Sequence, residues 1–597
     1  MSIRTERIEY INERSNIYCN MKYFKRVIFV IAALAGLMTA AAKTPKTPKL
    51  PKGTTVYGRV LLDGEAAQGI YVSDGRNIVW TDKNGWYSMA SDKSSSTVFV
   101  SFPGGTEVPV EKGMPQFWQP LNTDDAGVER HDFTLKSVSN DNYAFLAVSD
   151  IHLANLNDDA AQFSGPFMSR LNEERDKYIS KGLPVYCLNG GDSSYDRYWY
   201  EYLYAIEDFP KSLASVDFPM AMFSAMGNHD NDGGVEREGD VDWKASERYR
   251  RTMGPTWYSF NLGQVHYIVL DNIVYRNDEG RIDSYEGISG KRNYDCWIRD
   301  DQMDWLRRDL ETVTDKGTPL VVLMHAPLFN HKNEVDSAPI ISRMKKDGST
   351  AEELLKEFSA VFRGFDQVHF ISGHSHKIRT TKGADDTSTF PDLANITDHN
   401  VSGVCGVWWQ TASRGGLTLS PDSAPAGFET FIVNGRELEW YFVSTDDGAE
   451  RQFRVFDLNE VRNYWNSNGE VKAWRKHYPG REDYSKIEDN EVLIHVWAWE
   501  NGWSIKVEEE GRELPVEALK AENPQFVISY QIPKASWEDN GEKRWPDKYA
   551  KPTLCPHFFR TRASSASSTL TVTVTDIFGR SWSETVSRPK PFSKHMR

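Results

Sequence analysis

The stretch Pro219-Met-Ala-Met-Phe-Ser-Ala-Met-Gly-Asn-His-Asp230 is an apolar run of strand length that ends abruptly in polar residues. Asn228, His229 and Asp230 each need a polar partner once the strand leaves water. Gly227 permits a tight turn, which carries the side chains after it to the end of a sheet. Ligands of open α/β sheets bind at that end. A simple turn rich in Asn and Asp is the alternative interpretation, so the other strands must decide.

Four more apolar runs, residues 144–149, 183–189, 320–324 and 368–371, also end in residues that can bind a metal. Helical patterns separate them, as in residues 301–310, where apolar side chains recur at helical spacing. Strands that alternate with helices predict an α/β domain. The residues that follow the four runs are Asp150 and His152, Asp192, His325, and His374 with His376.

With Asn228, the five strand ends supply seven candidate metal ligands, in which carboxylate and amide oxygens are mixed with imidazoles and thiolates are absent. This mixture suits Mn, Zn, Fe or Ni better than an all-oxygen calcium site or a thiolate zinc site. Seven donors are more than the roughly four to six that one ion takes. Because a carboxylate can bridge, two divalent ions that share one aspartate are predicted. His266 and His369 lie inside strands, where we expect core histidines instead.

The motifs Asp150-x-His152, Gly191-Asp192, Gly227-Asn228-His229-Asp230, His325 and Gly373-His374-x-His376 resemble, in this order, those of the calcineurin-like metallophosphoesterase superfamily. The resemblance covers residues 143–450. Residues 254–260 and 265–271 are similar to segments of the same family, and residues 403–409 to the segment that closes the domain in its exported bacterial members. This sequence departs from the family pattern at one position. Tyr195 stands where the family usually has an aspartate, and Asp196 is the next residue.

The resemblance implies a ligand set for each ion. Asp150, His152 and His376 would hold the first ion, with Asp192 bridging to the second. Asn228, His325 and His374 would hold that second ion. His229 and Asp192 are the predicted catalytic residues, whereas the sequence identifies no substrate-binding residue.

The predicted function is a dinuclear metal-dependent phosphoesterase that hydrolyses phosphate mono- or diesters by metal-hydroxide attack. A water between two dications loses a proton near neutral pH, and His229 is placed to protonate the leaving alkoxide. The expected substrate is a small phosphorylated molecule, such as a nucleotide, a sugar phosphate or a lipid head group. Two alternatives stay open: a non-catalytic metal-containing binding protein, and a pyrophosphatase or nucleotidase acting on phosphoanhydrides.

The expected fold is a central α/β/β/α sandwich of two mixed sheets, residues 143–450, with a β-rich module on each side. Residues 54–137 contain short alternating runs and resemble a carboxypeptidase-regulatory β-sandwich. Asp82-Lys-Asn-Gly85 in this module predicts a hairpin turn rather than a calcium loop, because later carboxylates are missing. Residues 455–597 predict a small β domain, whose tryptophans (Trp465, Trp474, Trp497, Trp499, Trp503) suit core packing better than sugar stacking.

The amino terminus predicts export to the periplasm or secretion. A basic segment, residues 21–26, precedes an apolar one, residues 27–37, and then three alanines at 40–42, as in a signal peptide. The apolar part is shorter than the roughly 20 residues that span a bilayer, so no transmembrane segment is expected in the mature chain. Residues 1–42 are therefore an extension with a signal peptide, with Met21 as a possible start, and residues 43–53 are a linker.

The charge and the cysteines exclude other classes of protein. A net charge of −15 argues against a nucleic-acid-binding surface. Cys187, Cys296, Cys405 and Cys555 are too few and too dispersed for a disulfide framework. Cys187 lies within an apolar strand and predicts a buried free thiol. The sequence contains no signal for an oligomeric state.

Overall fold

The computed structural model describes residues 47–236, 238–276, 281–283, 287–289, 294–329, 351–383, 393–410, 417–539 and 554–596. The predicted signal peptide, residues 1–42, and the first residues of the predicted linker lie outside the described residues. Within these ranges, no helix has the length and apolar character needed to cross a membrane.

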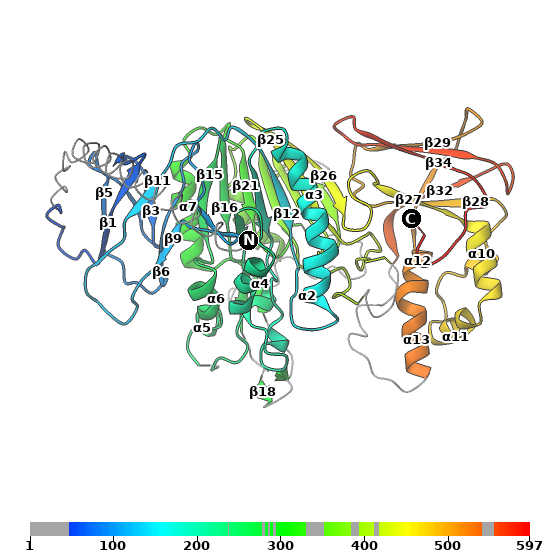
Figure 1. Cartoon of the computed structure of the whole chain (residues 1–597), viewed down its shortest axis with the longest axis horizontal. Coiled ribbons are helices and arrows are strands. Elements are labelled where there is room, and N and C mark those ends of the chain that lie inside the picture. Colours follow the sequence, from blue (N-terminus) through cyan, green and yellow to red (C-terminus); the bar gives the residue numbers. More distant parts are fainter. Residues whose placement is uncertain are drawn as a thin grey trace, which may run out of the picture. The chain divides into compact units, whose positions relative to one another are not determined.

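The central domain contains two mixed sheets (Figure 1). The first has the order β14-β13-β12-β25-β26, in which the three strands before the site motifs are parallel and β25 runs antiparallel to β12. Its strands are β12 (Asn142–Val148), β13 (Val185–Asn189), β14 (Met222–Ser224), β25 (Gly427–Asn434) and β26 (Glu437–Ser444).

The second sheet has the order β15-β16-β21-β22-β24-β23. Its four inner strands are parallel, and both edge strands run antiparallel to their neighbours. Its strands are β15 (Tyr258–Leu262), β16 (Val265–Val269), β21 (Leu320–Leu323), β22 (Val368–Ser372), β23 (Arg379–Lys382) and β24 (Ile396–Asn400).

The side chains of β12 alternate between two cores, as the period of a strand requires. Phe145 lies between the sheets, where its ring stacks on Phe431 of β25 with centroids 4.6 Å apart and meets Tyr267 of β16 at 5.9 Å. Leu146 and Val148 lie on the other face, in the core beneath the helices of the first sheet. The runs before the site motifs are apolar throughout because both faces of their strands are covered.

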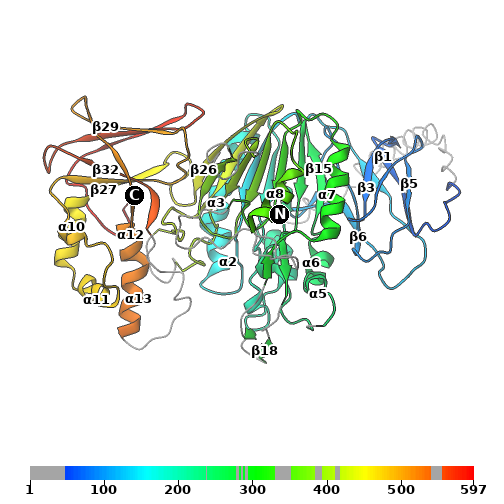
Figure 2. The same cartoon turned by 180° about the vertical axis from the view of Figure 1, so that it is seen from behind.

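Helices cover the outer face of each sheet. The helices α3 (Met168–Ile179) and α4 (Phe209–Ser215) share a core with the first sheet. The helices α7 (Asp300–Thr312) and α8 (Ala351–Ala360) lie over the second sheet (Figure 2). The α/β/β/α sandwich of two mixed sheets is therefore confirmed, as is the helix predicted over residues 301–310. Shorter elements are α2 (Asp159–Gln162), α5 (Val241–Ala245), α6 (Glu247–Thr252), β17 (Ile273–Tyr275), β18 (Arg281–Asp283), β19 (Gly287–Ser289) and β20 (Tyr294–Cys296).

Strands that precede the central domain form two sheets and a short ribbon. One sheet contains β1 (Val56–Leu62), β2 (Glu65–Ala66), β5 (Trp86–Met89), β10 (Glu129–Arg130) and β11 (Phe133–Leu135). The other contains β3 (Tyr71–Ser73), β4 (Ile78–Trp80), β6 (Thr97–Val100) and β9 (Trp118–Pro120), and the ribbon pairs β7 (Val110–Glu111) with β8 (Met114–Pro115).

The predicted hairpin at residues 82–85 is wrong in one respect. A turn is present, because the amide of Gly85 donates to the carbonyl of Asp82 at 2.9 Å. However, β4 before the turn pairs with β3, whereas β5 after it pairs with β1. The turn therefore joins two sheets. The Asp82 carboxylate accepts from the amides of Asn84 and Trp86, at 2.8 and 2.9 Å, as a turn residue does.

Two four-stranded sheets follow the central domain. Their strands are β27 (Phe453–Asp457), β28 (Glu491–Val496), β31 (Glu517–Ala521) and β32 (Cys555–Arg562) in one, and β29 (Ser504–Glu509), β30 (Arg512–Leu514), β33 (Leu570–Thr575) and β34 (Ser581–Val586) in the other. Trp465, Trp474, Trp497 and Trp503 are buried, as core packing predicts.

This C-terminal part also contains helices that were not predicted from the sequence. They are α10 (Leu458–Ser467), α11 (Gly469–His477), α12 (Pro524–Phe526), the π-helix η7 (Val527–Gln531) and α13 (Ile532–Asp539). A signal for α10 was present, because Leu458, Val461 and Trp465 recur at helical spacing and are buried. Asp457 caps this helix by accepting from the amide of Asn459.

Candidate metal centre

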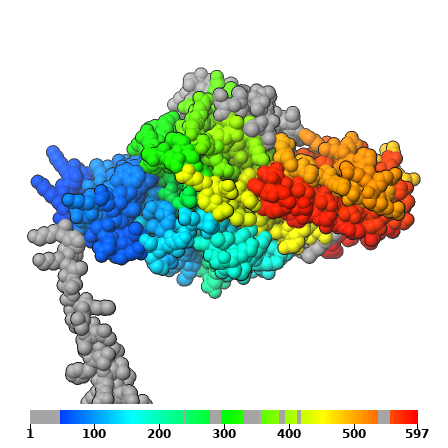
Figure 3. All heavy atoms as spheres, turned by 90° about the horizontal axis from the view of Figure 1, so that it is seen from above, coloured from blue at the N-terminus to red at the C-terminus, as the bar shows by residue number. Residues whose placement is uncertain are grey.

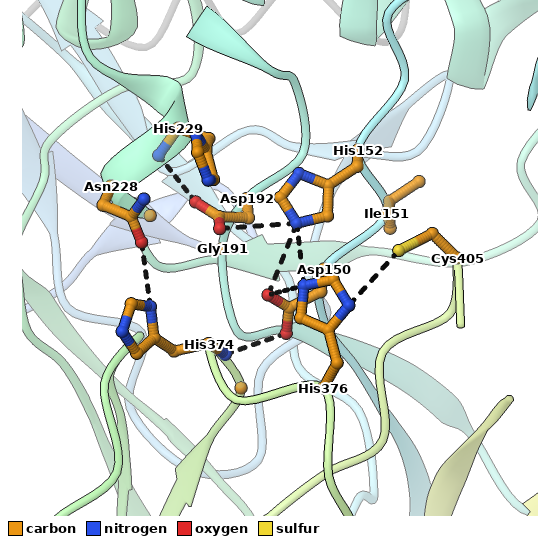
Figure 4. A network of polar contacts seen from close by, with 12 residues as sticks. Asp150, Ile151, His152, Gly191, Asp192, Asn228, His229, His374, His376 and Cys405 are labelled. Carbon is orange, nitrogen blue, oxygen red and sulfur yellow. Dashed lines mark hydrogen bonds and ion pairs between the residues drawn. The ribbon is translucent and has the colours of Figure 1, made fainter. Parts of the chain in front are cut away.

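Polar residues after β12, β13, β14, β21 and β22 converge at one place. Figure 4 shows those that follow β12, β13, β14 and β22. Each of the seven predicted metal ligands has a donor atom within 3.3 Å of a donor atom of another member. The structure thus brings together all seven: Asp150, His152, Asp192, Asn228, His325, His374 and His376.

The backbone turns sharply at these strand ends. Asp150, His152, Asp192, His374 and His376 all have positive φ angles, between 49° and 67°. Residues other than glycine seldom adopt this left-handed conformation. Such strain persists only where the surroundings enforce it, and it clusters at functional sites.

Two glycines of the motifs let the turns approach one another. A Cβ atom on Gly373 would overlap the carboxylate of Asp150, and one on Gly227 would overlap the carboxylate and amide of Asp192. These positions therefore have no room for a side chain, which explains why glycine precedes both Asn228 and His374.

One cluster consists of Asp150, His152 and His376. The Nε2 atoms of the two histidines are 3.0 Å apart. The Asp150 Oδ1 atom lies 3.3 Å from Nε2 of His376 and 3.7 Å from Nε2 of His152. Three donor atoms thus face a common centre.

A second cluster consists of Asn228, His325 and His374. The amide oxygen of Asn228 lies 3.0 Å from Nε2 of His325 and 2.9 Å from Nδ1 of His374, and these two nitrogens are 3.1 Å apart. Asp192 lies between the clusters, because its Oδ2 atom is 3.3 Å from Nε2 of His325 and 3.5 Å from Nε2 of His152.

Backbone carbonyls fix the orientation of two imidazoles. Nδ1 of His325 donates to the carbonyl of Gly190 at 2.8 Å, and Nδ1 of His376 donates to the carbonyl of Gly406 at 2.9 Å. In the neutral form of both rings, a protonated Nδ1 leaves the Nε2 lone pair directed at the cluster, as in histidines that bind a metal.

The pKa values of the acidic and imidazole groups in the two clusters favour the binding of cations. Burial opposes ionisation of Asp150, but the adjacent His376 and His152 outweigh it and hold the pKa of the carboxyl well below its usual value. Burial and the neighbouring His325 lower the pKa of His374 to about 3, so this imidazole is neutral. Burial disfavours a charge on His325, yet Asp192 and Asp150 raise its pKa to about 9, so this imidazole holds an extra proton in the metal-free protein. A divalent ion would replace that proton, because ionised carboxylates and neutral imidazoles are the forms that bind metals.

An unsatisfied atom also fits a metal centre. Oδ1 of Asp150 is fully buried and has no hydrogen-bond partner in the structure. Buried polar atoms without a partner are rare and costly. The donor set, its burial and this atom fit divalent ions.

His229 lies beside the two clusters. Its amide donates to Oδ1 of Asp192 at 2.7 Å, and its Nδ1 lies 2.8 Å from Oδ1 of Asp196. The ring meets that of Tyr195 edge-on, with centroids 4.3 Å apart. Asp196, in the 3-10 turn Asp196–Tyr198, is buried, so the carboxylate that follows Tyr195 contacts His229 directly.

Family models match three consecutive parts of the chain. The N-terminal model of calcineurin-like phosphoesterase matches residues 54–138, the calcineurin-like phosphoesterase model itself residues 143–378, and the C-terminal model residues 398–582. The chain belongs to the calcineurin-like phosphoesterase family. It is a metal-dependent hydrolase of phosphoric esters, and this family uses divalent metal ions.

Several solved structures are similar to this calcineurin-like phosphoesterase at low identity. Purple acid phosphatase PPD1 from yellow lupin (Lupinus luteus) is 12% identical, with 64% of this chain and 72% of that chain covered and a TM-score of 0.31. The 5'-nucleotidase from Candida albicans is 11% identical, with 52% and 53% covered and a TM-score of 0.28. The NAD nucleotidase of Haemophilus influenzae is 11% identical, with 50% and 49% covered and a TM-score of 0.24.

The alignment with each of these two nucleotidases spans only about half of that protein. The TM-scores are too low to transfer an activity from any of these structures. A search of the curated proteins gives no match.

Three neighbours of the centre in this calcineurin-like phosphoesterase were not predicted from the sequence. Asp196 was noted only as a displaced aspartate. Cys405 lies with its sulfur 3.6 Å from Nδ1 of His376, and burial raises the pKa of its thiol despite the nearby imidazole. Trp408 lies over His376, with ring centroids 4.4 Å apart. Only the match of residues 403–409 to the family pattern pointed to the last two.

Asp230, the last residue of the opening motif, has a structural role. Burial and the nearby Asp192 raise its pKa to about 7. Its carboxylate accepts from the amides of Gly227, Ser194 and Ser193, at 3.0, 2.9 and 3.3 Å. Asp230 therefore joins the strand end that carries Asn228 to the one that carries Asp192.

Proposed function

We propose that this protein hydrolyses phosphate mono- or diesters of a small organic molecule with two divalent ions. The observation that carries the proposal is the pair of three-donor clusters on either side of Asp192 Oδ2, each with its donor atoms 2.9–3.7 Å apart. A single ion would leave about half of these buried donor atoms without a metal to bind.

In this proposal Asp150, His152 and His376 hold one ion, and Asp192 is shared with the other. Asn228, His325 and His374 hold that other ion. Bound ions of this kind supply Lewis acidity toward phosphoryl oxygens and activate a water. The protein fixes the positions of the donors in advance, through the strained turns and the bonds to Gly190 and Gly406.

We assign His229 as the residue that gives a proton to the leaving alkoxide. Its amide holds Asp192 and its Nδ1 is bonded to Asp196, so the ring is oriented at the edge of the centre. Because Nδ1 is bonded to Asp196, the proton would pass from Nε2. This oriented pair favours an enzyme over the alternative of a metal-containing binding protein, which has no use for a proton donor.

The experiment is a substrate panel on chelator-treated protein to which Mn or Zn is returned. An alkyl phosphate, a nitrophenyl phosphate, a phosphodiester and pyrophosphate together separate the possible reactions. We expect hydrolysis of at least one ester, its loss on chelation, and its loss in His374→Ala but not in His477→Ala, a histidine of helix α11. Cleavage of pyrophosphate alone would favour the phosphoanhydride alternative, and cleavage of none would favour the binding protein.

We also propose that the protein is exported, because residues 21–42 have the pattern of a signal peptide. Amino-terminal sequencing of the mature protein should give a start close to residue 43. Recovery of a chain that starts at Met1 from the cytosol would contradict export.

A further inference from the structure

We propose that Tyr530, in the C-terminal part of the chain, is a positioning residue for the metal ligand His376. Its hydroxyl holds the loop whose carbonyl orients that imidazole. The inference rests on the proposed function, because it requires that His376 binds an ion.

The loop next to His376 adopts an unusual conformation. The carbonyl of Gly406 accepts the proton of His376 Nδ1 at 2.9 Å. Gly406, Trp408 and Trp409 all have positive φ angles, of 53°, 46° and 56°. Tryptophan seldom adopts this conformation, so contacts from outside the loop must enforce it.

A backbone hydrogen bond connects this loop to the segment that begins at Leu417. The amide of Val407 donates to the carbonyl of Leu419 at 3.0 Å. Val407 directly follows Gly406, so the position of Leu419 sets the direction of the Gly406 carbonyl. That carbonyl in turn sets the orientation of the His376 ring.

Tyr530 holds the segment around Leu419 from the other side. Its hydroxyl accepts from the amide of Leu419 at 3.2 Å and donates to the carbonyl of Leu417 at 3.2 Å. Tyr530 is 1% exposed and lies in the π-helix η7, a conformation often found at functional sites. Its ring stacks on that of Phe526 with centroids 4.9 Å apart. A contiguous series of hydrogen bonds therefore runs from Tyr530 to His376.

Apolar packing supports the same connection. Val407, Trp408, Leu417 and Leu419 share one buried cluster with Phe526 and Tyr530. Another group of buried apolar side chains joins Ile378, two residues after His376, to Ala424, Phe442 and Trp497. In the space-filling view the C-terminal residues, orange and red, adjoin the yellow residues of the central domain (Figure 3).

The support is one-sided. Nδ1 of His325 in the second cluster donates to Gly190, at the end of a strand of the first sheet, and not to a residue near Tyr530. Removal of the Tyr530 hydroxyl should therefore weaken binding of the ion at Asp150, His152 and His376. Binding of the ion at Asn228, His325 and His374 should not change. General destabilisation of the fold would weaken binding of both ions together.

The test compares Tyr530→Phe with Tyr484→Phe in the full-length protein. Tyr484 is 1% exposed in the same C-terminal part, and its hydroxyl donates to the carbonyl of Glu522, away from the loop. Each variant loses one buried hydroxyl and keeps its ring. Calorimetric titration of chelator-treated protein with Mn gives the two dissociation constants, and thermal unfolding of the metal-free protein reports stability.

In Tyr530→Phe we expect one dissociation constant to rise roughly tenfold, the lower end of the 10–100-fold loss seen when a group that orients a ligand is removed. The other constant should stay within about twofold of wild type, and both should be unchanged in Tyr484→Phe. Unchanged constants in Tyr530→Phe, equal weakening of both, or the same pattern in Tyr484→Phe would overturn the positioning role. A wild-type protein that binds two ions but hydrolyses no ester would instead overturn the proposed function.

Discussion

The substitution His229→Ala should separate catalysis from metal binding. It removes the ring but keeps the hydrogen bond that the amide of residue 229 donates to Asp192 Oδ1, because the donor is a backbone group. The seven donors of the two clusters remain, so the protein should bind as many ions as wild type. The turnover number should fall by roughly 10²–10⁴, the usual contribution of a positioned acid.

The structure also gives a stability cost for this substitution. His229 Nδ1 lies 2.8 Å from the buried carboxylate of Asp196. Loss of a hydrogen bond to a charged group lowers the free energy of unfolding by about 1.5–3 kcal/mol. Asp196→Asn keeps the ring of His229 and should reduce turnover less than His229→Ala does.

The assay measures turnover on esters whose leaving groups differ in acidity, together with bound metal. The loss in His229→Ala should be largest for alkyl phosphates and smallest for nitrophenyl phosphate, whose leaving group needs little protonation. His374→Ala is the control, because removal of a ligand should lose metal and activity together on every substrate.

Two results would refute this reasoning. His229 can also join His152 and Asp192 as a possible group of metal ligands, with ligand atoms within 4.8 Å of one another. If His229→Ala loses an ion, His229 is a ligand or supports one. If turnover falls equally on all esters, His229 stabilises the phosphoryl oxygens and is not the acid.

Three further substitutions test a turn of the site, a buried carboxylate and the core. Gly373→Ala should abolish binding of an ion, measured by metal analysis, because its Cβ would overlap the Asp150 carboxylate, whereas Gly469→Ala has open space and should bind as wild type. Burial raises the pKa of Asp398 to about 7 from an ordinary 3.8, so the contribution of this carboxyl to stability falls as the pH rises between these values. Asp398→Asn should therefore have a higher melting temperature than wild type at pH 8 and should lose this advantage at pH 4. Phe260→Ala removes a fully buried ring and should lower the free energy of unfolding by about 3–5 kcal/mol in urea titrations.

The strands and the meeting of their polar ends could be predicted because the signals are local. A strand buried on both faces is an apolar run, and the residues after it must lie at the sheet edge. The seven residues predicted as ligands lie together in the structure for this reason. The proximity of Asp196 to His229 was not predicted, because it depends on the 3-10 turn at residues 196–198.

Contacts between distant segments left no such signal. Tyr530 is 111 residues from Leu419 along the chain, and its partners there are backbone atoms. Since every residue except proline has the same backbone amide and carbonyl, no residue type could indicate this bond. The turn at residues 82–85 shows the same limit, because its residues specify a turn but not which strands pair on either side.

Anomalous diffraction from a crystal grown with Mn tests the central claim most directly. We expect two peaks, one between Asp150, His152 and His376 and one between Asn228, His325 and His374, with Asp192 in contact with both ions. A single peak, or ions bound away from these residues, would contradict a dinuclear centre.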